Sequence, residues 1–465
     1  IAQIGNFQSV YLTRRVEIDE AKGDRLCFIS GECNAPNSKP KFDGRINISK
    51  TFVTETINYS SNFDGKRFDR NFRINGETQV ALNAASDYLL NNLSVRIADV
   101  RHVIIPSWLS GQELDDAAIT GIESKADLLF SFQQLKNITT PLEKASENEG
   151  ADFPFWITLL GYESNGTFFK VVNTIQDVPS FYFNCLHKEL EIMRRDMLAI
   201  VGKQFFNFYT IYHQIPILKE TARSEALQFL KAILEQRPIA NDTLWKHFAV
   251  LARCHFYGSY KKYKNISDET EWAEGKGLEP ADVGWIQTVR IYTLLRLYLS
   301  RLQLLEGAQY TVSPQNINLY DMPENAQEWC EKLGLTARQK ALFYLGQALN
   351  SMALAQKKKG NAKRILQKVN FNGMHAEDLF TLHNDLVENA SVYRDDYYGT
   401  VLDRIRDDLS RFSEGFDRNT WTHDSKMGDN QQVDPAISPE EALYWLLSGY
   451  TYRRPKNDNE DPEQS

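Results

Sequence analysis

The chain has 465 residues, of which 42 % are hydrophobic and 12 % aromatic, so it has room for two or three domains with packed cores. Its formal net charge of −8 argues against indiscriminate coating of nucleic acid, because long-range repulsion opposes the approach of phosphates, and any polyanion must therefore meet local basic patches. Five scattered cysteines and the lack of an apolar run of about 18 residues predict reduced thiols, a cytoplasmic location and no membrane contact.

Residues 1–184 are predicted to form a mixed α/β domain. Short runs rich in β-branched and aromatic residues alternate there with clusters of Asn, Gly, Pro and Ser, which is typical of strands and turns. One helix interrupts them at residues 77–93, where Val80, Ala84, Tyr88 and Leu89 share one helical face. The clearest strand signals cover residues 9–18, 101–108, 154–164 and 167–175.

From residue 185 onward the pattern changes to long amphipathic helices, and strand signals almost vanish. We predict a helical middle region over residues 185–321, a C-terminal helical bundle over 322–455 and a disordered acidic tail over 456–465. The complete chain is thus predicted to have an α+β fold. The predicted helices cover residues 183–214, 224–236, 243–263, 282–308, 340–356, 376–412 and 442–452.

Two helices of the predicted bundle carry recognisable starts. Thr336 and Gln339 form a T-x-x-Q capping box, and Ser438 with Pro439 and Glu441 forms an S-P-x-E start. The helix after the first of these starts has one apolar face, made of Leu342, Leu345, Leu349, Met352 and Ala353.

The residue types of a catalytic centre are few and scattered. No glycine-rich phosphate loop, G-x-S-x-G elbow or H-E-x-x-H motif is present. Cys27 and Cys33 lack the second cysteine pair of a structural zinc site, and the dipeptide His423-Asp424 lacks the further ligands of a metal-dependent hydrolase. His213, His247 and His255 lie among aromatic residues, as satisfied core or surface histidines do. We therefore predict neither an enzyme, nor a metal site, nor a cofactor.

The strongest positive signal is a cationic run after the helix at 340–356. The nearest acidic residues in the sequence are Glu331 and Glu377, so the run has no local counter-charges. Lysines at a helix end also interact favourably with the C-terminal dipole, which accounts for about three of the six cations. We favour a track for nucleic-acid backbone, made of Lys357, Lys358, Lys359, Lys363, Arg364 and Lys368.

A second basic patch, "RCHFYGSYKKYKN", interleaves tyrosines with cations. Its tyrosines, Tyr257, Tyr260 and Tyr263, are spaced like a core stripe, which is the better interpretation for two of them. Cations beside flat rings are also what single-stranded nucleic acid requires, because bases stack while phosphates pair with the charges. The predicted backbone contacts of this patch are Lys261, Lys262 and Lys264.

Two N-terminal segments are predicted to contact duplex DNA. One is a Pro-containing loop with amide and amine side chains that suit a minor-groove reader, and the other mixes arginines with phenylalanines in a loop or hairpin. The residues concerned are Asn34, Asn37, Lys39 and Lys41 in the first segment and Lys66, Arg67 and Arg70 in the second.

Several segments resemble the large-subunit family of type I-B CRISPR interference (Cascade) complexes. "KALFYLGQALNSMALAQ" is similar to that family's F-x-L-G-x-L helix, "ILQKVNFNGMHAEDLFTLHNDLVE" to its N-F-x-G-M joint, and "ISPEEALYWLLSGYTY" to its closing helix. Upstream, "CFISGE" resembles a cysteine-containing turn, followed by a similar helix and the strand "RHVIIPSW". Many relatives carry C-x-x-C pairs in the turn and the helix, and this chain departs from them at Ser30 and Asn75–Gln79.

The resemblance implies a non-catalytic subunit that recognises the protospacer-adjacent motif, helps to open target double-stranded DNA and stabilises the R-loop. Its partners would be guide RNA, the backbone, guide-end and small subunits, and the helicase-nuclease. The C-terminal bundle resembles the small subunit, for which Met322 is a candidate internal start. The alternatives are an architectural scaffold that binds RNA or partner subunits without reading DNA, and a nuclease.

Overall fold

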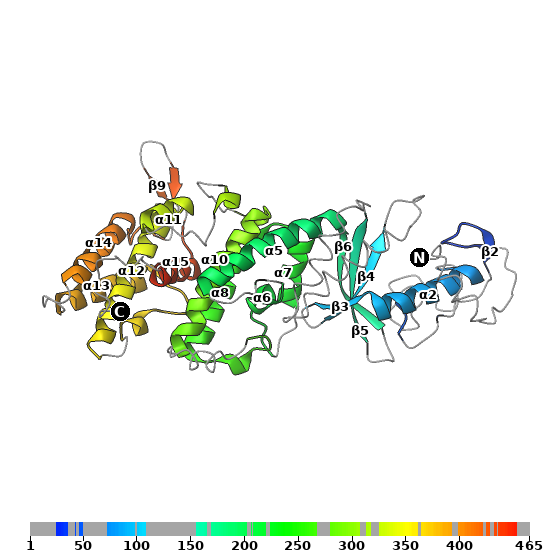
Figure 1. Cartoon of the computed structure of the whole chain (residues 1–465), viewed down its shortest axis with the longest axis horizontal. Coiled ribbons are helices and arrows are strands. Elements are labelled where there is room, and N and C mark those ends of the chain that lie inside the picture. Colours follow the sequence, from blue (N-terminus) through cyan, green and yellow to red (C-terminus); the bar gives the residue numbers. More distant parts are fainter. Residues whose placement is uncertain are drawn as a thin grey trace. The chain divides into compact units, whose positions relative to one another are not determined.

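The chain divides into two compact units, Ile1–Cys185 and Leu186–Ser465, which are described separately below (Figure 1). The mixture of sheets and helices confirms the predicted α+β class. The structure is a computed structural model, and it describes residues 25–35, 42, 46–49, 72–97, 100–107, 155–164, 169–201, 206, 208–219, 224–266, 280–306, 313–317, 325–360, 364–392, 399–421, 425–427, 432–434 and 436–452.

The first unit contains a four-stranded antiparallel sheet in the order β3-β4-β5-β6. Its strands are β3 (Ser94–Ile97), β4 (Val100–Ser107), β5 (Trp156–Ser164) and β6 (Phe169–Pro179). Three of the four predicted strands are therefore confirmed, and the one at 9–18 lies outside the described residues. Helix α2 (Gly76–Asn92) packs on β3 and β4, as its predicted apolar face requires. A small hairpin of β1 (Arg25–Leu26) and β2 (Cys33–Ala35) precedes α2 in the chain.

The centre of this sheet holds a buried histidine. His102 pairs with Gly161 on β5, and its Nε2 lies 3.5 Å from the Asn173 amide nitrogen on β6. A side chain at Gly161 has no room, because its Cβ would lie 2.7 Å from that Nε2 atom. The glycine is therefore what admits an imidazole into the interior of the sheet.

The second unit is mostly helical. Before residue 322 it contains α5 (Ser180–Val201, which begins in the first unit), α6 (Phe208–His213), α7 (Ser224–Leu234), β7 (Ile239–Ala240), α8 (Asn241–Tyr257), η3 (Tyr260–Lys262), α10 (Pro280–Arg301), β8 (Leu305–Glu306) and η4 (Pro314–Asn316). After it come α11 (Ala326–Lys332), α12 (Ala337–Lys358), η5 (Arg364–Lys368), α13 (Ala376–Val392), α14 (Gly399–Gly415), β9 (Ser425–Met427), β10 (Gln432–Asp434) and α15 (Pro439–Thr451).

Several predicted helices have different bounds. The helix predicted at 183–214 is α5 and α6, and the one at 376–412 is α13 and α14. The helix at 243–263 ends at Tyr257 because Gly258, with φ 65°, forms a left-handed C-cap. The helix at 282–308 ends at Arg301, where the chain continues into β8, which pairs in parallel with β7. The predicted capping box of Thr336 and Gln339 is confirmed, as is the Ser438 cap of α15.

Helix α12 is the centre of the C-terminal part and packs against α14 and α15. Two glycines bring α12 and α15 into close contact. A Cβ at Gly346 would lie 1.9 Å from the Leu446 carbonyl oxygen, and one at Gly449 would lie 1.8 Å from the Phe343 carbonyl oxygen. The glycines of the "FYLG" and "SGY" stretches thus serve packing of the two backbones.

The boundary predicted at residues 321/322 lies inside this unit, where α15 also packs on α8 and α10. Tyr444 lies 4.6 Å from Trp245 and 5.1 Å from Phe248, ring centroid to centroid. The Arg296 guanidinium of α10 lies over Trp245 and Trp445, 4.7 and 4.9 Å from the ring centroids. The middle helices and the C-terminal bundle therefore share one aromatic core.

Candidate nucleic-acid interface

The predicted phosphate track begins at the end of α12. Lys357 and Lys358 lie in its last turn and Lys359 at its C-cap, and all three are exposed. Lys357 and Lys358 thus also interact favourably with the C-terminal helix dipole, which is the alternative interpretation of the run. Gly360 follows with a left-handed φ of 73°, and its N–H donates to Lys357 O at 3.0 Å. Lys363 and the side chain of Arg364 lie outside the described residues.

The segment η5 is anchored beneath these lysines. The Gln356 side chain accepts a hydrogen bond from the Ile365 N–H at 3.0 Å, and Ile365 and Leu366 are buried. Lys368, at the end of η5, is exposed, but its Nζ lies 3.2 Å from the Asp385 carboxylate of α13. The expectation that the run lacks acidic partners is therefore wrong for Lys368, because the fold brings a helix from later in the chain alongside it.

The second patch lies where α8 gives way to η3. An antiparallel bridge joins Leu218 to Tyr263, with the Lys219 N–H donating to Lys262 O at 3.0 Å. Lys261, Lys262 and Lys264 are exposed, and so is Lys219. Sequence reasoning missed Lys219, because it is a single cation whose only signal is the bridge that places it beside the patch.

The three tyrosines of this patch differ in exposure. Tyr263 is a core residue with 8 % exposure, and the Tyr260 hydroxyl lies 3.2 Å from Nδ1 of His255. Tyr257 retains 61 % of its surface. The core interpretation therefore suits Tyr263, and Tyr257 is the ring available to a stacked base.

Phe371 brings the two cationic segments together. It follows η5, is fully buried, and stacks on Phe256 of α8 with a centroid distance of 4.0 Å and an interplanar angle of 16°. Its ring also meets the edge of Tyr257 at 6.4 Å. Next to it, Arg253 donates to the Asn372 side chain at 2.6 Å. Sequence reasoning missed Phe371 as well, since nothing local indicates its partner on α8.

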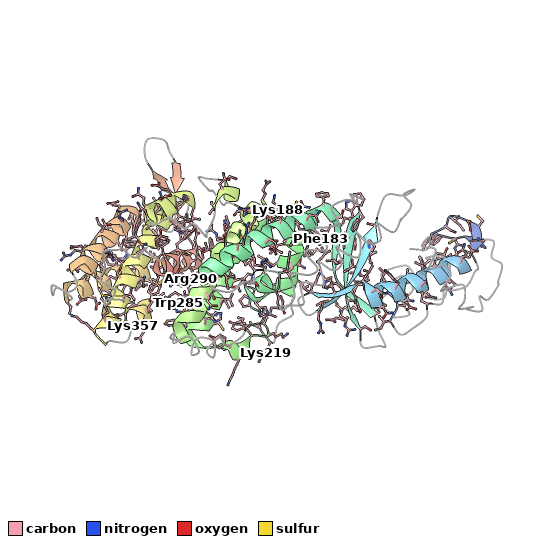
Figure 2. All side chains as sticks on the ribbon, viewed as in Figure 1. Phe183, Lys188, Lys219, Trp285, Arg290 and Lys357 are labelled. Atoms are coloured by element: carbon pink, nitrogen blue, oxygen red, sulfur yellow. The ribbon has the colours of Figure 1, made fainter. Side chains whose placement is uncertain are left out.

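We call this region the joint surface. In Figure 2, Lys219 and Lys357 both lie along the lower edge of the second unit, whereas Lys188 of α5 lies at its upper edge. The joint surface consists of Lys219, Arg253, Tyr257, Lys261, Lys262, Lys264, Lys357, Lys358, Lys359 and Lys368.

The N-terminal candidates are only partly visible. Asn34 is exposed but lies on strand β2, not on the flexible loop that we predicted. Its amide donates to Glu32 at 2.8 Å and accepts from the Asn75 amide at 2.9 Å, so both of its ends have partners within the chain. The other predicted duplex contacts lie outside the described residues: Asn37, Lys39, Lys41, Lys66, Arg67 and Arg70.

The histidines and cysteines are the residues that could hold a metal ion or carry out chemistry. Within the described ranges, no group of three or more His, Cys, Asp or Glu side chains could hold a metal ion. Burial lowers the pKa of His247, and it raises the pKa of the Cys330 thiol to about 12. The His213 ring contacts the Asn265 carbonyl oxygen. His423 and Asp424 lie outside the described residues, and no helix that the structure describes is both long and apolar enough to cross a membrane.

Comparison with known protein families identifies the family of the chain. Residues 206–464 match the C-terminal domain of the CRISPR-associated protein TM1802 family, and residues 24–178 match that family's central domain. The chain belongs to the CRISPR-associated TM1802 family. The resemblance noted in the sequence is thereby confirmed at the level of a CRISPR-associated protein. No curated protein matches the chain.

The TM1802 match also bears on the candidate surface. Its C-terminal domain spans both cationic segments and Phe371, so the whole joint surface lies in one family domain. A role in a CRISPR-Cas system follows from the family.

Proposed function

We propose that this chain is the non-catalytic large subunit of a type I-B CRISPR surveillance complex. In such a complex a guide RNA pairs with the target strand, while the large subunit recognises the protospacer-adjacent motif, helps to unwind the duplex, stabilises the R-loop and recruits the helicase-nuclease. Two facts support the proposal: membership of the TM1802 family and the convergence of the predicted basic segments on Phe371.

Within this function, the joint surface binds single-stranded DNA backbone. Its exposed lysines belong to the two segments that Phe371 joins, and Tyr257 is held in place by Phe256 and Phe371. A ring held by its neighbours, together with exposed cations, suits a strand whose bases stack while its phosphates pair, and it requires no particular sequence. Contact with the flanking motif stays a prediction for the N-terminal segments.

The test measures binding of labelled single-stranded DNA by the full chain as a function of salt. Counterion release gives a slope of about −0.7 in log K per log salt for each phosphate contact. Replacing Lys357, Lys358 and Lys359 by Glu should reduce that slope by about 2, if each lysine contacts one phosphate. The single reversals Lys357→Glu and Lys188→Glu form a matched pair, because Lys188 lies on the opposite edge of the unit.

Stacking is tested separately at Tyr257. Tyr257→Ala should weaken binding by about 1–3 kcal/mol, whereas Tyr257→Phe should retain it, since only the ring is required. Equal losses from Lys188→Glu and Lys357→Glu, or no loss from Tyr257→Ala, would remove the joint surface from the binding site.

Experiments on assembled complexes distinguish the proposed function from the architectural alternative. Complexes with and without this chain are compared by gel shift on duplexes that vary only in the flanking motif. A large subunit makes the shift depend on that motif. If guide RNA and other subunits co-purify while the shift is the same with and without the chain, the chain is a scaffold.

A further inference from the structure

The turn between β1 and β2 encloses a cysteine. The Cys27 N–H donates to Glu32 O at 2.7 Å, and the Gly31 N–H donates back to Cys27 O at 2.9 Å. Gly31 has φ 74°, which favours glycine at this position. The Cys27 sulfur accepts a hydrogen bond from the Ser30 N–H at 3.5 Å and is fully buried. The turn thus directs polar groups at Sγ.

The start of α2 presents a second polar pair to this turn. Asn75 is the N-cap, and its side-chain oxygen accepts from the Thr78 N–H at 2.8 Å. The Asn75 amide nitrogen lies 3.5 Å from Ser30 Oγ, and Thr78 Oγ1 lies 3.7 Å from Cys27 Sγ. Two pairs with the same three-residue spacing, Cys27/Ser30 and Asn75/Thr78, therefore meet face to face.

The two distances between these pairs match those of a zinc site. Sulfurs bound to zinc at 2.3 Å in a tetrahedron lie about 3.8 Å from one another, close to the contacts between the two pairs. The chemistry is different, however. Structural zinc takes thiolates, imidazoles or carboxylates, and this cluster offers one thiol, two hydroxyls and one amide. The donor set does not fit the zinc that the C-x-x-C pairs of relatives imply.

Hydrogen bonds already satisfy the sulfur. Desolvation acts to raise the pKa of Cys27, but hydrogen bonds from Ser30, Asn75 and Ile29 outweigh it and lower the pKa to about 6. Negative charge on the sulfur is thus stabilised by N–H and O–H groups of the chain. These are the interactions by which a protein stabilises a thiolate without a metal ion.

We propose that this chain closes its hairpin against α2 with a metal-free hydrogen-bonded cluster of Cys27, Ser30, Asn75 and Thr78, built on a frame with the spacing of a four-ligand zinc site. The cluster positions Asn34 through Asn75. It also fixes the turn that exposes Phe28 and Ile29. The order of this hairpin is therefore independent of zinc supply and of chelators.

The first experiment measures the metal content and thermal unfolding of the full chain with and without EDTA. We expect zinc well below one equivalent per chain and the same Tm in both conditions. One equivalent of zinc, with a Tm that falls in EDTA, would overturn the proposal. The variant Cys27→Ser is a second test. We expect a small change in Tm and an unchanged metal content. Loss of one zinc equivalent in this variant would contradict a metal-free cluster.

The second experiment tests the frame itself. The triple variant Ser30→Cys/Asn75→Cys/Thr78→Cys should bind about one zinc per chain and acquire a chelator-sensitive Tm, because four thiolates then surround the same point. The control adds Cys27→Ser to the triple variant, which leaves three thiols and should bind zinc far more weakly. A folded triple variant that takes up no zinc would show that the four positions do not form such a frame.

Discussion

The hairpin of the first unit and the joint surface of the second unit use polar residues in opposite ways. In the hairpin, amides and hydroxyls bind one another, and Asn34 has partners for both ends of its side chain. At the joint surface, apolar rings hold the segments together, and lysines such as Lys357 remain exposed above them. Polar residues that are satisfied internally support a fold, whereas exposed cations on a rigid base are available for an external partner.

The largest effect on this contrast is expected from removing the ring that supports the joint surface. Phe371→Ala deletes a buried ring that stacks on Phe256 and meets the Trp285 ring at 6.0 Å. We expect a loss of about 3–5 kcal/mol in the free energy of unfolding, because a large cavity is left in the core. Binding of single-stranded DNA should fall as well, although no cation has been changed. Chemical denaturation and salt titration measure the two effects.

Phe371→Leu is the matched control. It keeps most of the buried volume, so stability should fall less, and the backbone of the two cationic segments should stay in place. If Phe371→Ala unfolds with the stability of the native chain, the ring does not hold the segments together and the contrast between the units fails.

A pH experiment sharpens the other side of the comparison, the internally satisfied polar groups of the first unit. Burial lowers the pKa of His102 from 6.5 to about 4, outweighing its hydrogen bond to the Val100 carbonyl at 2.9 Å. His102 therefore binds a proton near pH 6.5 in the unfolded chain, but only near pH 4 in the folded chain. Stability is full above pH 6.5 and falls by about 3 kcal/mol as the pH drops to about 4.

The measurement is denaturant unfolding at several pH values, with amide hydrogen exchange of β5 reporting on the first unit. His102→Gln retains a polar side chain without the titration, so its stability should depend less steeply on pH between 6.5 and 4. An equal slope in both chains would show that His102 is not the group responsible.

Much of the fold could be predicted from local patterns, and the rest depends on contacts between distant residues. The helical face of α12 and its capping box follow from residues three and four apart, and both were found. The bend at Gly258 was missed because the apolar pattern continues past it as far as Tyr263, which is buried through a bridge to Leu218. Local periodicity cannot distinguish a continued helix from a segment packed back onto the core.

The candidate nucleic-acid interface shows the same difference between local patterns and contacts of distant residues. Clustered lysines were visible in the sequence, because charge density is a local property. Their partners were not visible: Asp385 reaches Lys368 from α13, and Phe371 reaches α8. Likewise, the residue type of Asn34 predicts a DNA contact, and only the fold shows that Asn75 lies within its reach. Residue type indicates what a side chain can bind, and the fold decides which partner is within reach.

The smallest expected effect concerns Lys368, whose ammonium group pairs with the Asp385 carboxylate of α13. Asp385→Asn removes the carboxylate that competes with phosphate for its ammonium group, at 3.2 Å. The lost ion pair should cost at most about 1 kcal/mol in stability, since Lys368 is largely exposed. Affinity for single-stranded DNA should rise a few-fold at low salt, and the slope should steepen by at most about 0.7.

The control for Lys368 is a charge change of the same sign on the same helix. Glu388→Gln removes one negative charge from α13 at an exposed position one turn away, so it changes the long-range field without releasing a cation. If both variants raise the affinity equally, only net charge matters, and the pair does not regulate access to Lys368. If Asp385→Asn acts more strongly, and Lys368→Gln abolishes that difference, the ion pair itself limits binding. An internal acid would then tune the joint surface by keeping Lys368 from a phosphate.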